Sequence, residues 1–576
     1  MTGRTNPNRN QMKRIIFFLI FSGIILQLFG KTGSSGFYER IYVQTDKHLY
    51  LAGESVLMKL LTTGPEQIPV SFSKVAYVEL VADTIAQLQI KVELTNGTGA
   101  GYMALPADLP SGYYRLIAYT QWMRNEGVDV FFEKNIAVLN TFHSGYYPEY
   151  QYENTLSYVD DSRADGLSLQ LNKTTYTKRA HGELILNGLP ENMHTLSVCI
   201  AGTDFIPVIE TGVSLFQKNR MKKAAGNTID IRQHGEFLPE YEGHIVTGII
   251  VDNRTDQAVI TDPLPVTGLS FPGGGIRFFT GQKTGTAAIR FFTPGISGTK
   301  EIATVVYAEG EKYRVDIQSP FITKYVPKAM PALHIDSACY DQLLARSIAL
   351  QAFRYFSDDQ PEKRNISEPY LKMTPTASYP LDDYTRFTTM REVFIEFIAG
   401  ARFRRNGDKQ ELSVFVKRGD FYYYGPMPLV LLDGVPVSDH DVIYNYNPLA
   451  VEKINIYYGP YILGGQVFDG IVELTTYSRL HADLNLNRSS QILSYEGPQL
   501  PYRPVTPDYS ENKNRQNRIP DGRHTLLWNP DVQTDGKTSI RLPFVTSDLA
   551  GEFQATVEGV THDGEFIYVT STFIIE

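Results

Sequence analysis

The best candidate for a metal site in this sequence is the run Asp439-His440-Asp441. Carboxylate and imidazole groups are ligands that divalent transition metals accept. No further ligand follows at a fixed spacing, and the 11 histidines of the chain include no His-Glu-x-x-His pair. A Gly-x-Ser-x-Gly nucleophile turn is also missing, and Gly273–Gly275 lacks the Lys-Ser/Thr of a phosphate loop. We therefore expect a polar loop at 439–441 and a non-enzymatic protein with no cofactor, no bound metal and no small-molecule substrate.

A second group of motif residues, between Pro428 and Thr476, consists of turns and strands rather than of reactive side chains. An apolar strand ends in a Leu-Asp-Gly turn, an alternating strand leads to a Gly-Pro turn, and a glycine pair precedes the closing strand. This order resembles the plug domain of outer-membrane TonB-dependent receptors. The positions that match it are Arg418, Gly419, Leu432, Asp433, Gly434, Gly459, Pro460, Gly464, Gly465 and Gly470.

The segment before this motif agrees with the resemblance. Thr389 and Glu392 have the spacing of a capping box, and apolar residues follow with the period of one buried helical face. The next strand ends in Arg418-Gly419, as the corresponding strand of a plug domain does. The helical face is predicted to consist of Met390, Val393, Phe394, Phe397 and Ile398.

In the receptors the plug lies inside a large membrane barrel. Only 100 residues follow Thr476 here, whereas a barrel of about 22 strands needs well over roughly 200. We expect no barrel in this chain. The resemblance then implies a plug fold reused as a binding module, whose partner is an outer-membrane barrel protein or complex. Several tyrosines could supply contact area, although core and hairpin packing is the expected use of most of them. They are Tyr422, Tyr423, Tyr424, Tyr444, Tyr446, Tyr457, Tyr458 and Tyr461.

Residues 40–56 predict a strand, a turn that carries Lys47 and Tyr50, and a second strand reached through Gly53-Glu54. This pattern resembles the macroglobulin-type β-sandwich of the alpha-2-macroglobulin family. Alternating strands continue to residue 141, which suits one sandwich of about 100 residues.

The spacing of Lys and Tyr recurs 126 positions later at Lys173 and Tyr176, and Gly182-Glu183 again leads into an apolar strand after three extra residues. The repeat predicts a second macroglobulin-type sandwich. A third unit begins at 241–252, where glycine-spaced strands lead to a turn at 252–256, and this pattern resembles carboxypeptidase-regulatory-like sandwiches. The tail again looks macroglobulin-like, with Trp528 as an anchor of its core.

Thioester members of the alpha-2-macroglobulin family join a cysteine to a glutamine three positions later, a spacing that Cys339 and Gln342 share. Tyr340-Asp341 replaces the Gly-Glu expected between them, and the chain has no room for the helical domain that shelters a thioester. We expect instead a helix with a buried cysteine and an exposed glutamine. Cys199, 140 positions away, is expected to be a second isolated thiol.

Residues 1–31 have the cationic, apolar and small-residue sections of a secretory signal peptide, with an uncleaved membrane anchor as the alternative. Their removal changes the net charge from −9 to −14. An acidic mature chain argues against nucleic acid as a partner. We expect an exported protein of the periplasm or of either face of the outer membrane.

Together these features predict a mainly β fold: tandem Ig-like, macroglobulin-type sandwiches plus one small α+β plug-like domain. The expected function is that of an exported scaffold or binding protein, an accessory subunit of an outer-membrane transport or assembly complex. Two alternatives remain, a protease-trapping protein and a TonB-coupled substrate-gating component. The expected units are a signal peptide (1–31), a first sandwich (37–141), a second sandwich (160–235), a third sandwich (236–325), a helical or loop connector (326–384), the plug-like domain (385–480), a linker (481–517) and a C-terminal sandwich (518–576).

Overall fold

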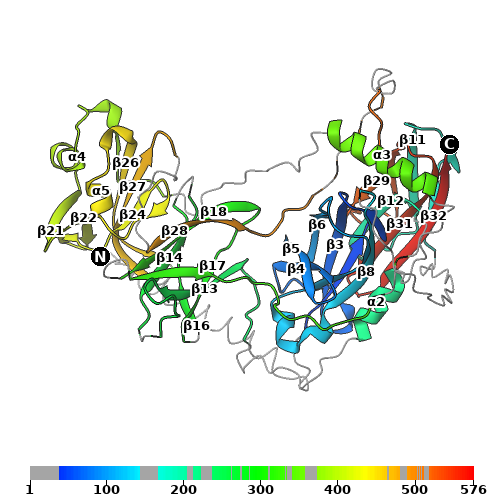
Figure 1. Cartoon of the computed structure of the whole chain (residues 1–576), viewed down its shortest axis with the longest axis horizontal. Helices are drawn as coiled ribbons and strands as arrows, with labels where there is room; N and C mark the ends of the chain where they lie inside the picture. The colour runs from blue at the N-terminus through cyan, green and yellow to red at the C-terminus, as the bar shows by residue number, and fades with distance from the viewer. Residues whose placement is uncertain are drawn as a thin grey trace, which may run out of the picture.

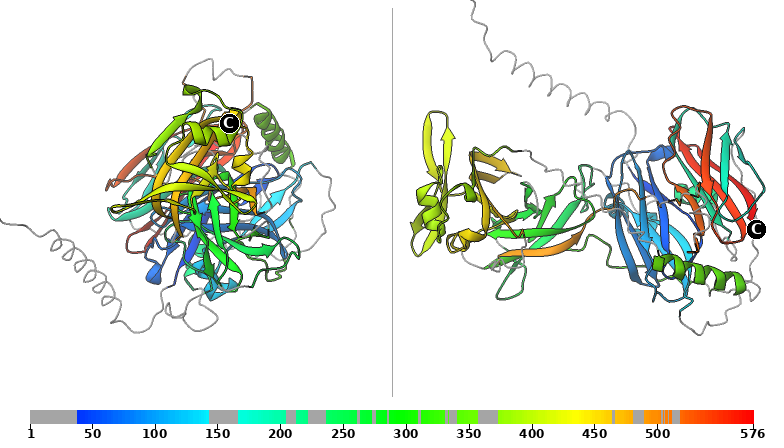
Figure 2. Two further views of the ribbon diagram at one scale, coloured as in Figure 1. Left: turned by 90° about the vertical axis from the view of Figure 1, so that its left-hand side faces the viewer. Right: turned by 90° about the horizontal axis from the view of Figure 1, so that it is seen from above.

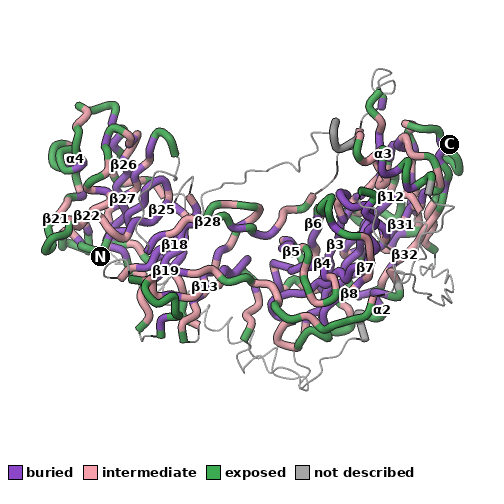
Figure 3. Tube along the Cα trace, in the orientation of Figure 1, coloured by how far each residue is buried: buried purple, intermediate pink, exposed green. Residues whose placement is uncertain are grey.

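The computed structural model describes residues 38–142, 166–203, 212–221, 236–260, 263–272, 276–284, 286–308, 312–330, 333, 340–356, 373–463, 466–479, 489–502, 504, 506–507, 509–510 and 518–576. In these residues the chain is mainly β, with several sheets and a few short helices, which confirms the predicted fold class. Two lobes are joined by a narrow waist (Figure 1, Figure 2). Buried positions follow the strands of both lobes, as Figure 3 shows.

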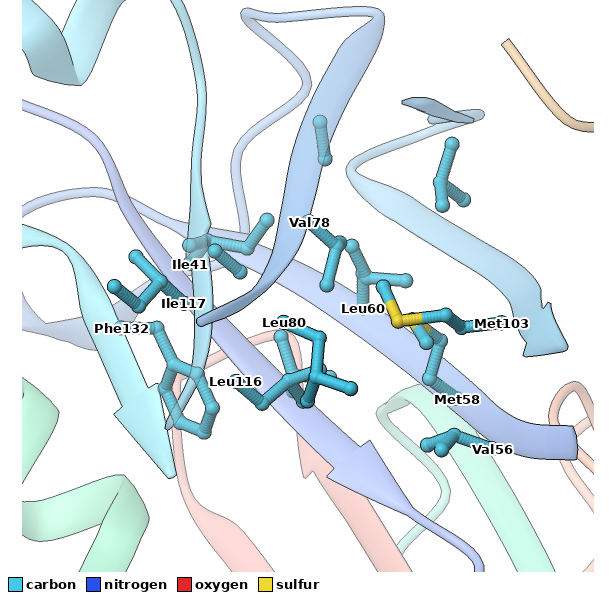
Figure 4. Close-up of a cluster of buried hydrophobic side chains, with 14 of the residues drawn as sticks. Ile41, Val56, Met58, Leu60, Val78, Leu80, Met103, Leu116, Ile117 and Phe132 are labelled. Atoms are coloured by element: carbon cyan, nitrogen blue, oxygen red, sulfur yellow. The ribbon is translucent and has the colours of Figure 1, made fainter. Parts of the chain in front are cut away.

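The first sandwich belongs to the right-hand lobe of Figure 1, and its two sheets have the strand orders β1-β3-β6 and β2-β8-β7-β4-β5. Apolar side chains of both sheets, among them Ile41, Leu80 and Phe132, fill the space between them (Figure 4). The strands are β1 (Arg40–Thr45), β2 (Leu49–Leu51), β3 (Ser55–Thr63), β4 (Val75–Ala82), β5 (Ile85–Glu93), β6 (Thr98–Ala104), β7 (Gly112–Tyr119) and β8 (Phe132–Leu139). Three short 3-10 helices are η1 (Pro65–Gln67), η2 (Trp122–Glu126) and η3 (Val128–Val130).

The second sandwich is built from two distant stretches of chain. Its sheets have the orders β9-β11-β30 and β10-β32-β31-β12-β29. The strands are β9 (Ser168–Leu171), β10 (Thr175–Tyr176), β11 (His181–Asn187), β12 (Met193–Gly202), β29 (Thr525–Asn529), β30 (Ser539–Val545), β31 (Gly551–Thr561) and β32 (Phe566–Ile575). This arrangement differs from the two separate sandwiches expected at 160–235 and 518–576. The physical reason is that each stretch supplies only half of the strands and cannot bury an apolar face alone.

The two sandwiches share one topology. When the strands of each are numbered along the chain, both have sheets in the orders 1-3-6 and 2-8-7-4-5. In the first sandwich a tight turn at Asp83-Thr84 joins strands 4 and 5, and Asp83 has φ 50°. In the second sandwich residues 203–524 lie between the corresponding strands β12 and β29. Residues 203–524 are therefore an insertion at the position that the β4–β5 hairpin turn occupies in the first sandwich.

The third sandwich lies in the other lobe and has the sheets β16-β17-β13-β19 and β15-β14-β18-β28. Its last strand, β28, falls within the segment 481–517, which was expected to be a linker. The segment forms a strand there because its apolar residues Leu493 and Tyr495 pack into this core. Residues 318–489 are thus inserted between its last two strands. The strands are β13 (Ile245–Asp252), β14 (Val266–Ser270), β15 (Phe278–Thr280), β16 (Gln282–Thr284), β17 (Ala288–Phe292), β18 (Thr299–Tyr307), β19 (Tyr313–Ile317) and β28 (Ser490–Glu496).

Residues 373–479, which we call the distal unit, form the left-hand end of Figure 1. Its mixed sheet has the order β21-β22-β26-β27-β24-β25, with β20 beside β26 and β23 beside β22. One apolar cluster of the sheet includes residues of the helices, and another joins Leu429 and Ile471 to Phe278 of the third sandwich. The elements are β20 (Ala377–Pro380), η5 (Leu381–Asp383), α4 (Met390–Glu396), β21 (Ala401–Asn406), β22 (Lys409–Arg418), β23 (Phe421–Gly425), β24 (Leu429–Leu432), β25 (Val435–Pro436), α5 (Asp441–Tyr444), η6 (Pro448–Ala450), β26 (Val451–Leu463) and β27 (Gln466–Thr476).

Two helices, α2 (Gly212–Met221) and α3 (Tyr340–Phe356), lie outside these units. The predicted helix is α3, and its Leu343 packs against Leu49 and Leu51 of the first sandwich. In the described part of the chain, no helix has both the length and the apolar character needed to cross a membrane. The predicted signal peptide falls outside the described residues.

A buried polar network joins the lobes at the waist. The Glu240 carboxylate accepts hydrogen bonds from the Tyr77 hydroxyl at 2.9 Å and from the Ile245 amide at 2.8 Å. His244 lies between Glu240, at 2.8 Å from Nδ1, and the Tyr495 hydroxyl, at 2.6 Å from Nε2. Burial lowers the pKa of His244, against the opposing effect of Glu240. These contacts tie β4 of the first sandwich to both sheets of the third.

Candidate interaction surface

The helix that begins the motif region of the distal unit has the predicted cap. The Glu392 amide donates to Thr389 Oγ1 at 3.3 Å, and the Thr389 amide donates to Glu392 Oε2 at 3.2 Å. This reciprocal pair confirms the capping box. Met390 and Val393 of the predicted stripe are buried in the core of the unit. The helix is thereby fixed on the sheet that carries the motif.

The Leu432-Asp433-Gly434 motif is a tight turn between β24 and β25. Asp433 has φ 51° and Gly434 has φ 82°, as the two central residues of a type I′ turn do. The Asp433 carboxylate accepts hydrogen bonds from the Thr476 amide at 2.7 Å and from the Thr476 hydroxyl at 2.6 Å. Leu432 is fully buried. This part of the motif is a structural clamp between a hairpin and the end of β27.

Arg418-Gly419 occupies the turn between β22 and β23. The register pairs Arg418 with Phe421, so Gly419 and Asp420 form the loop. Gly419 has φ 64°, which suits the first central position of a type II′ turn. The turn and the first three residues of β23 are exposed to solvent. The hairpin therefore ends in an accessible tip.

Gly459 and Pro460 do not form a turn, contrary to the prediction. They lie inside β26, where the pairing with β27 shifts register between Tyr458 and Tyr461. A Cβ atom at Gly459 would lie 1.9 Å from the Asp469 carbonyl oxygen. The glycine is thus required by the close approach of two strands at a bulge rather than by a chain reversal.

Gly470 is a second point of close approach. A Cβ atom there would lie 2.4 Å from Val414 Cγ1 of the crossing strand β22. Gly464 and Gly465 lie outside the described residues. The structure brings Gly459 and Gly470 together at neighbouring pairs of β26 and β27 and leaves the Asp433 clamp at the far end of the same ladder.

Large apolar side chains are exposed at the end of the distal unit where β22 and β26 finish. The two strands run parallel through the pair Val416 and Gly459, so their hairpin tips lie at the same end of the sheet. Met427 is attached there through its amide, which donates to the Asp469 carboxylate at 3.0 Å. We call these side chains the aromatic rim; its members and exposed fractions are Phe421 78%, Tyr422 56%, Tyr423 44%, Met427 56%, Ile462 74% and Val467 50%.

Basic groups surround the aromatic side chains of β23. The Arg402 guanidinium lies 3.8 Å from the ring centroid of Tyr424, and Lys417 Nζ lies 5.6 Å from that of Tyr422. Residues 401–425 contain six Lys or Arg and three Asp or Glu, although the whole chain has a net charge of −9. Exposed aromatic residues with arginine are typical of protein interfaces.

Side chains of the Asp439-His440-Asp441 run accept hydrogen bonds from the main chain of β22, the first strand of the hairpin. The Leu412 amide donates to His440 Nδ1 at 3.0 Å, and the Gln410 amide donates to Asp441 Oδ1 at 2.9 Å. Burial lowers the pKa of His440 to about 4, so the ring stays neutral and can accept this bond. Among the described residues no group of His, Cys, Asp and Glu side chains could hold a metal ion.

Of the two residues with thioester spacing, only Gln342 is among the described residues. Cys339 lies outside them, whereas Gln342 is an exposed residue of α3. Cys199 is buried as a free thiol at the contact of the first two sandwiches, and burial raises its pKa. Trp528 lies in the same cluster, between the sandwiches rather than in the core of one.

The sequence motifs identified the Asp433-Gly434 turn but missed most of the rim. Met427, Ile462 and Val467 follow no motif, and only the tyrosine run at 422–424 drew attention. Alternation alone would have assigned one face of each strand to the core. Near the end of β26, Leu463 packs with Phe278 of the third sandwich, whereas the neighbouring Ile462 is exposed.

No protein-family model and no curated protein sequence matches the chain. Among solved structures it is similar to a Salmonella alpha-2-macroglobulin reacted with methylamine, at 9% identity and a TM-score of 0.24, over 94% of this chain and 40% of that chain. It is also similar to the native conformation of Escherichia coli alpha-2-macroglobulin, at 10% identity and a TM-score of 0.24, over 95% of this chain and 40% of that chain. A third is the Escherichia coli adhesin FdeC, at 11% identity and a TM-score of 0.13, over 47% of this chain and 60% of that chain. The chain thus spans about 40% of the length of these macroglobulins.

Proposed function

We propose that this chain is an exported, non-enzymatic scaffold protein that acts as an accessory subunit of an outer-membrane transport or assembly complex. Its distal unit is a plug-like module that docks on a barrel protein or its complex. The sandwiches hold this module away from the body of the scaffold. The observation that carries the proposal is the aromatic rim, a set of large, exposed apolar side chains on the distal unit.

The nested insertions support a presenting role. The chain reaches the distal unit after α3, which packs on the first sandwich, and leaves it into β28 of the third sandwich, which is itself inserted in the second. The outer insertion begins and ends at the paired strands β12 and β29, and the inner one begins and ends at β19 and β28, in the two facing sheets of the third sandwich. The buried Glu240 network holds the waist. A surface carried in this way keeps a defined position relative to the body, which suits a scaffold better than a flexible tether would.

Crosslinking in intact outer membranes tests the function. A photoreactive residue at Met427 is expected to form crosslinks, identified by mass spectrometry, to one outer-membrane barrel protein or its direct partner. The control is the same residue at Ile85, an exposed position on β5 of the first sandwich. The proposal fails if the chain is recovered free and monomeric, or if the crosslinks join it to proteases.

A further inference from the structure

The outermost strand of the distal unit has a free edge. Among the described strands, β23 pairs only with β22. Arg418 and Phe421 flank a two-residue turn and so form a hydrogen-bonded pair. Because such pairs alternate along an antiparallel ladder, the main-chain groups of Tyr422 and Tyr424 point away from β22. An unpaired row of N–H and C=O groups is a template for another strand.

Nothing in β23 protects this edge. Natural edge strands are shielded by proline, by bulges or by inward-pointing charges. The strand Phe421–Gly425 contains no proline or charged residue, and its pairing with β22 shows no register shift. Its first three side chains are instead large, aromatic and exposed. They would flank an added strand and exclude water from the new hydrogen bonds.

The charges near this edge favour a negatively charged partner segment. Lys417 and Arg418 lie on the paired strand, opposite Tyr422 and Phe421. Arg402 lies against Tyr424. The three acidic residues of 401–425 do not neutralise its six basic ones. An acidic partner segment would gain from this field, and a basic one would be repelled.

We propose that β23 accepts an extended, acidic segment of a partner protein as an additional β-strand. The inference rests on the proposed scaffold function and names the chemistry of its contact. Main-chain hydrogen bonds to Tyr422 and Tyr424 would supply affinity, and the aromatic and basic side chains would supply selectivity.

The test is selection from a displayed library of random peptides of about ten residues, the length of a typical strand with its flanks. The full chain is the bait. Enriched peptides are expected to be rich in Asp and Glu, to contain β-branched residues and to lack proline. A selected peptide is then measured by fluorescence anisotropy, and its affinity should fall as salt is added. Absence of enrichment, or enrichment of basic or proline-rich peptides, would overturn the proposal.

Two variants test the edge and the charge separately. Tyr422→Pro removes an outward N–H and leaves the ladder to β22 intact, so peptide binding should weaken at least about tenfold. Lys417→Glu/Arg418→Glu keeps the edge and should shift selection toward basic peptides. Tyr241→Pro, at an exposed position outside the distal unit, is the control for the substitution itself and should bind like the parent. Equal binding by Tyr422→Pro, or an unchanged preference in the charge-reversed variant, would refute strand addition.

Two other occupants are distinguished in the same series. Recovery of the chain on phosphatidylglycerol vesicles, abolished by Lys417→Glu/Arg418→Glu while no peptide binds, would assign the surface to a membrane. Dimerisation in sedimentation velocity that Tyr422→Pro abolishes would assign it to a second copy. Either outcome overturns the acidic-segment proposal. Crosslinks from Met427 to a barrel protein without peptide binding would leave the proposed function standing and remove only this inference.

Discussion

The first and second sandwiches each fix a tyrosine with the same set of hydrogen bonds, but the surroundings of the two tyrosines differ. In the first, the Tyr50 hydroxyl donates to Asp46 Oδ1 at 2.7 Å and accepts from the Lys47 amide at 3.1 Å. The Leu57 amide also donates to Asp46 Oδ1, at 3.1 Å. We call this arrangement the tyrosine lock. It fixes the short strand β2 beside β8.

The second sandwich repeats the lock with an amide in place of the carboxylate. The Tyr176 hydroxyl donates to Asn172 Oδ1 at 2.6 Å and accepts from the Lys173 amide at 3.2 Å. The Glu183 amide donates to the same Asn172 oxygen at 2.9 Å. All four positions are shifted by 126 from the first lock. A neutral acceptor therefore satisfies the local geometry.

The carboxylate of the first lock has contacts that the amide of the second lacks. Asp46 Oδ2 accepts from Thr525 Oγ1 of the second sandwich at 2.6 Å. Lys47 lies 3.1 Å from Glu54, which Arg346 of α3 contacts at 2.8 Å. These side chains are buried, whereas Asn172 and its lysine neighbour are exposed. The buried charges of the first lock therefore serve the contacts with other parts of the protein, since the second lock forms without them.

Removing a partner of the buried charges in the first sandwich should lower the free energy of unfolding more than any other change proposed here. Arg346→Ala leaves the buried Glu54 carboxylate without its two-pronged partner, which typically costs about 3–5 kcal/mol. Arg541→Ala is the control, because it removes only an exposed contact to Glu183 worth about 0–1 kcal/mol. Hydrogen exchange of the first sandwich in increasing urea measures both. Equal protection in the two variants would contradict the proposed difference.

Asp46→Asn converts the first lock into the chemistry of the second. The tyrosine bond should survive, whereas the contacts to Lys47 and Thr525 lose a charge, at a cost of about 2–3 kcal/mol. Asn172→Asp makes the opposite change on an exposed site and should alter the free energy of unfolding by less than about 0.5 kcal/mol. Urea unfolding followed by tryptophan fluorescence measures the pair, because Trp528 lies at the contact between the sandwiches. A large effect of Asn172→Asp would show that the second lock is as constrained as the first.

The repeat was visible in the sequence, but its alignment was not. The shared spacing of Lys and Tyr predicted two related sandwiches. Matching Gly53-Glu54 to Gly182-Glu183 required three extra residues, whereas the structure equates Leu57 with Glu183 and needs none. Gly182 lies inside β11, where a Cβ atom would meet the Phe544 ring at 2.3 Å. The two Gly-Glu pairs are therefore not equivalent, because Gly182 lies inside a strand whereas Gly53 lies in a turn with φ 95°.

Long-range pairing was the part of the fold that local patterns could not supply. Alternation predicts that a segment is a strand but not which strand it pairs with, so β12 and β31, more than 300 residues apart, were assigned to separate sandwiches. The same holds for the candidate site. Tyr422 and Tyr423 could be recognised as strand residues, but a free edge depends on what does not lie beside the strand. A Gly-Pro pair predicts a turn because that is its commonest use, whereas Gly459 and Pro460 lie inside β26.

A third change replaces one buried lysine by its counterpart in the other sandwich. Lys59 pairs with Gln44 in β3, and Ile185 pairs with Gln170 in β11, at the same offset. Lys59 Nζ is buried without a hydrogen-bond partner. Burial lowers its pKa to about 7, against the attraction of Asp531 and Glu558.

Lys59→Ile should therefore stabilise the protein by roughly 1–2 kcal/mol at pH 6. Between pH 7 and about 10.5 the unfolded chain holds a proton on Lys59 that the folded chain lacks, so parental stability rises with pH across this window. The advantage of the variant should shrink over the same window. Urea midpoints at pH 6 and pH 9 measure it, and a pH-independent gain would mean that the amine is solvated in the folded protein.

The smallest effect should come from removing the two tyrosine hydroxyls. Tyr50→Phe leaves the buried Lys47 amide without its acceptor, which costs about 1–2 kcal/mol. Tyr176→Phe makes the same deletion where Asn172 and Lys173 are exposed, so water replaces the hydroxyl at a cost of about 0.5 kcal/mol or less. Thermal unfolding of the two variants measures the difference. Because both deletions remove the same atom from the same hydrogen-bond pattern, the gap between them measures what burial alone adds to the lock.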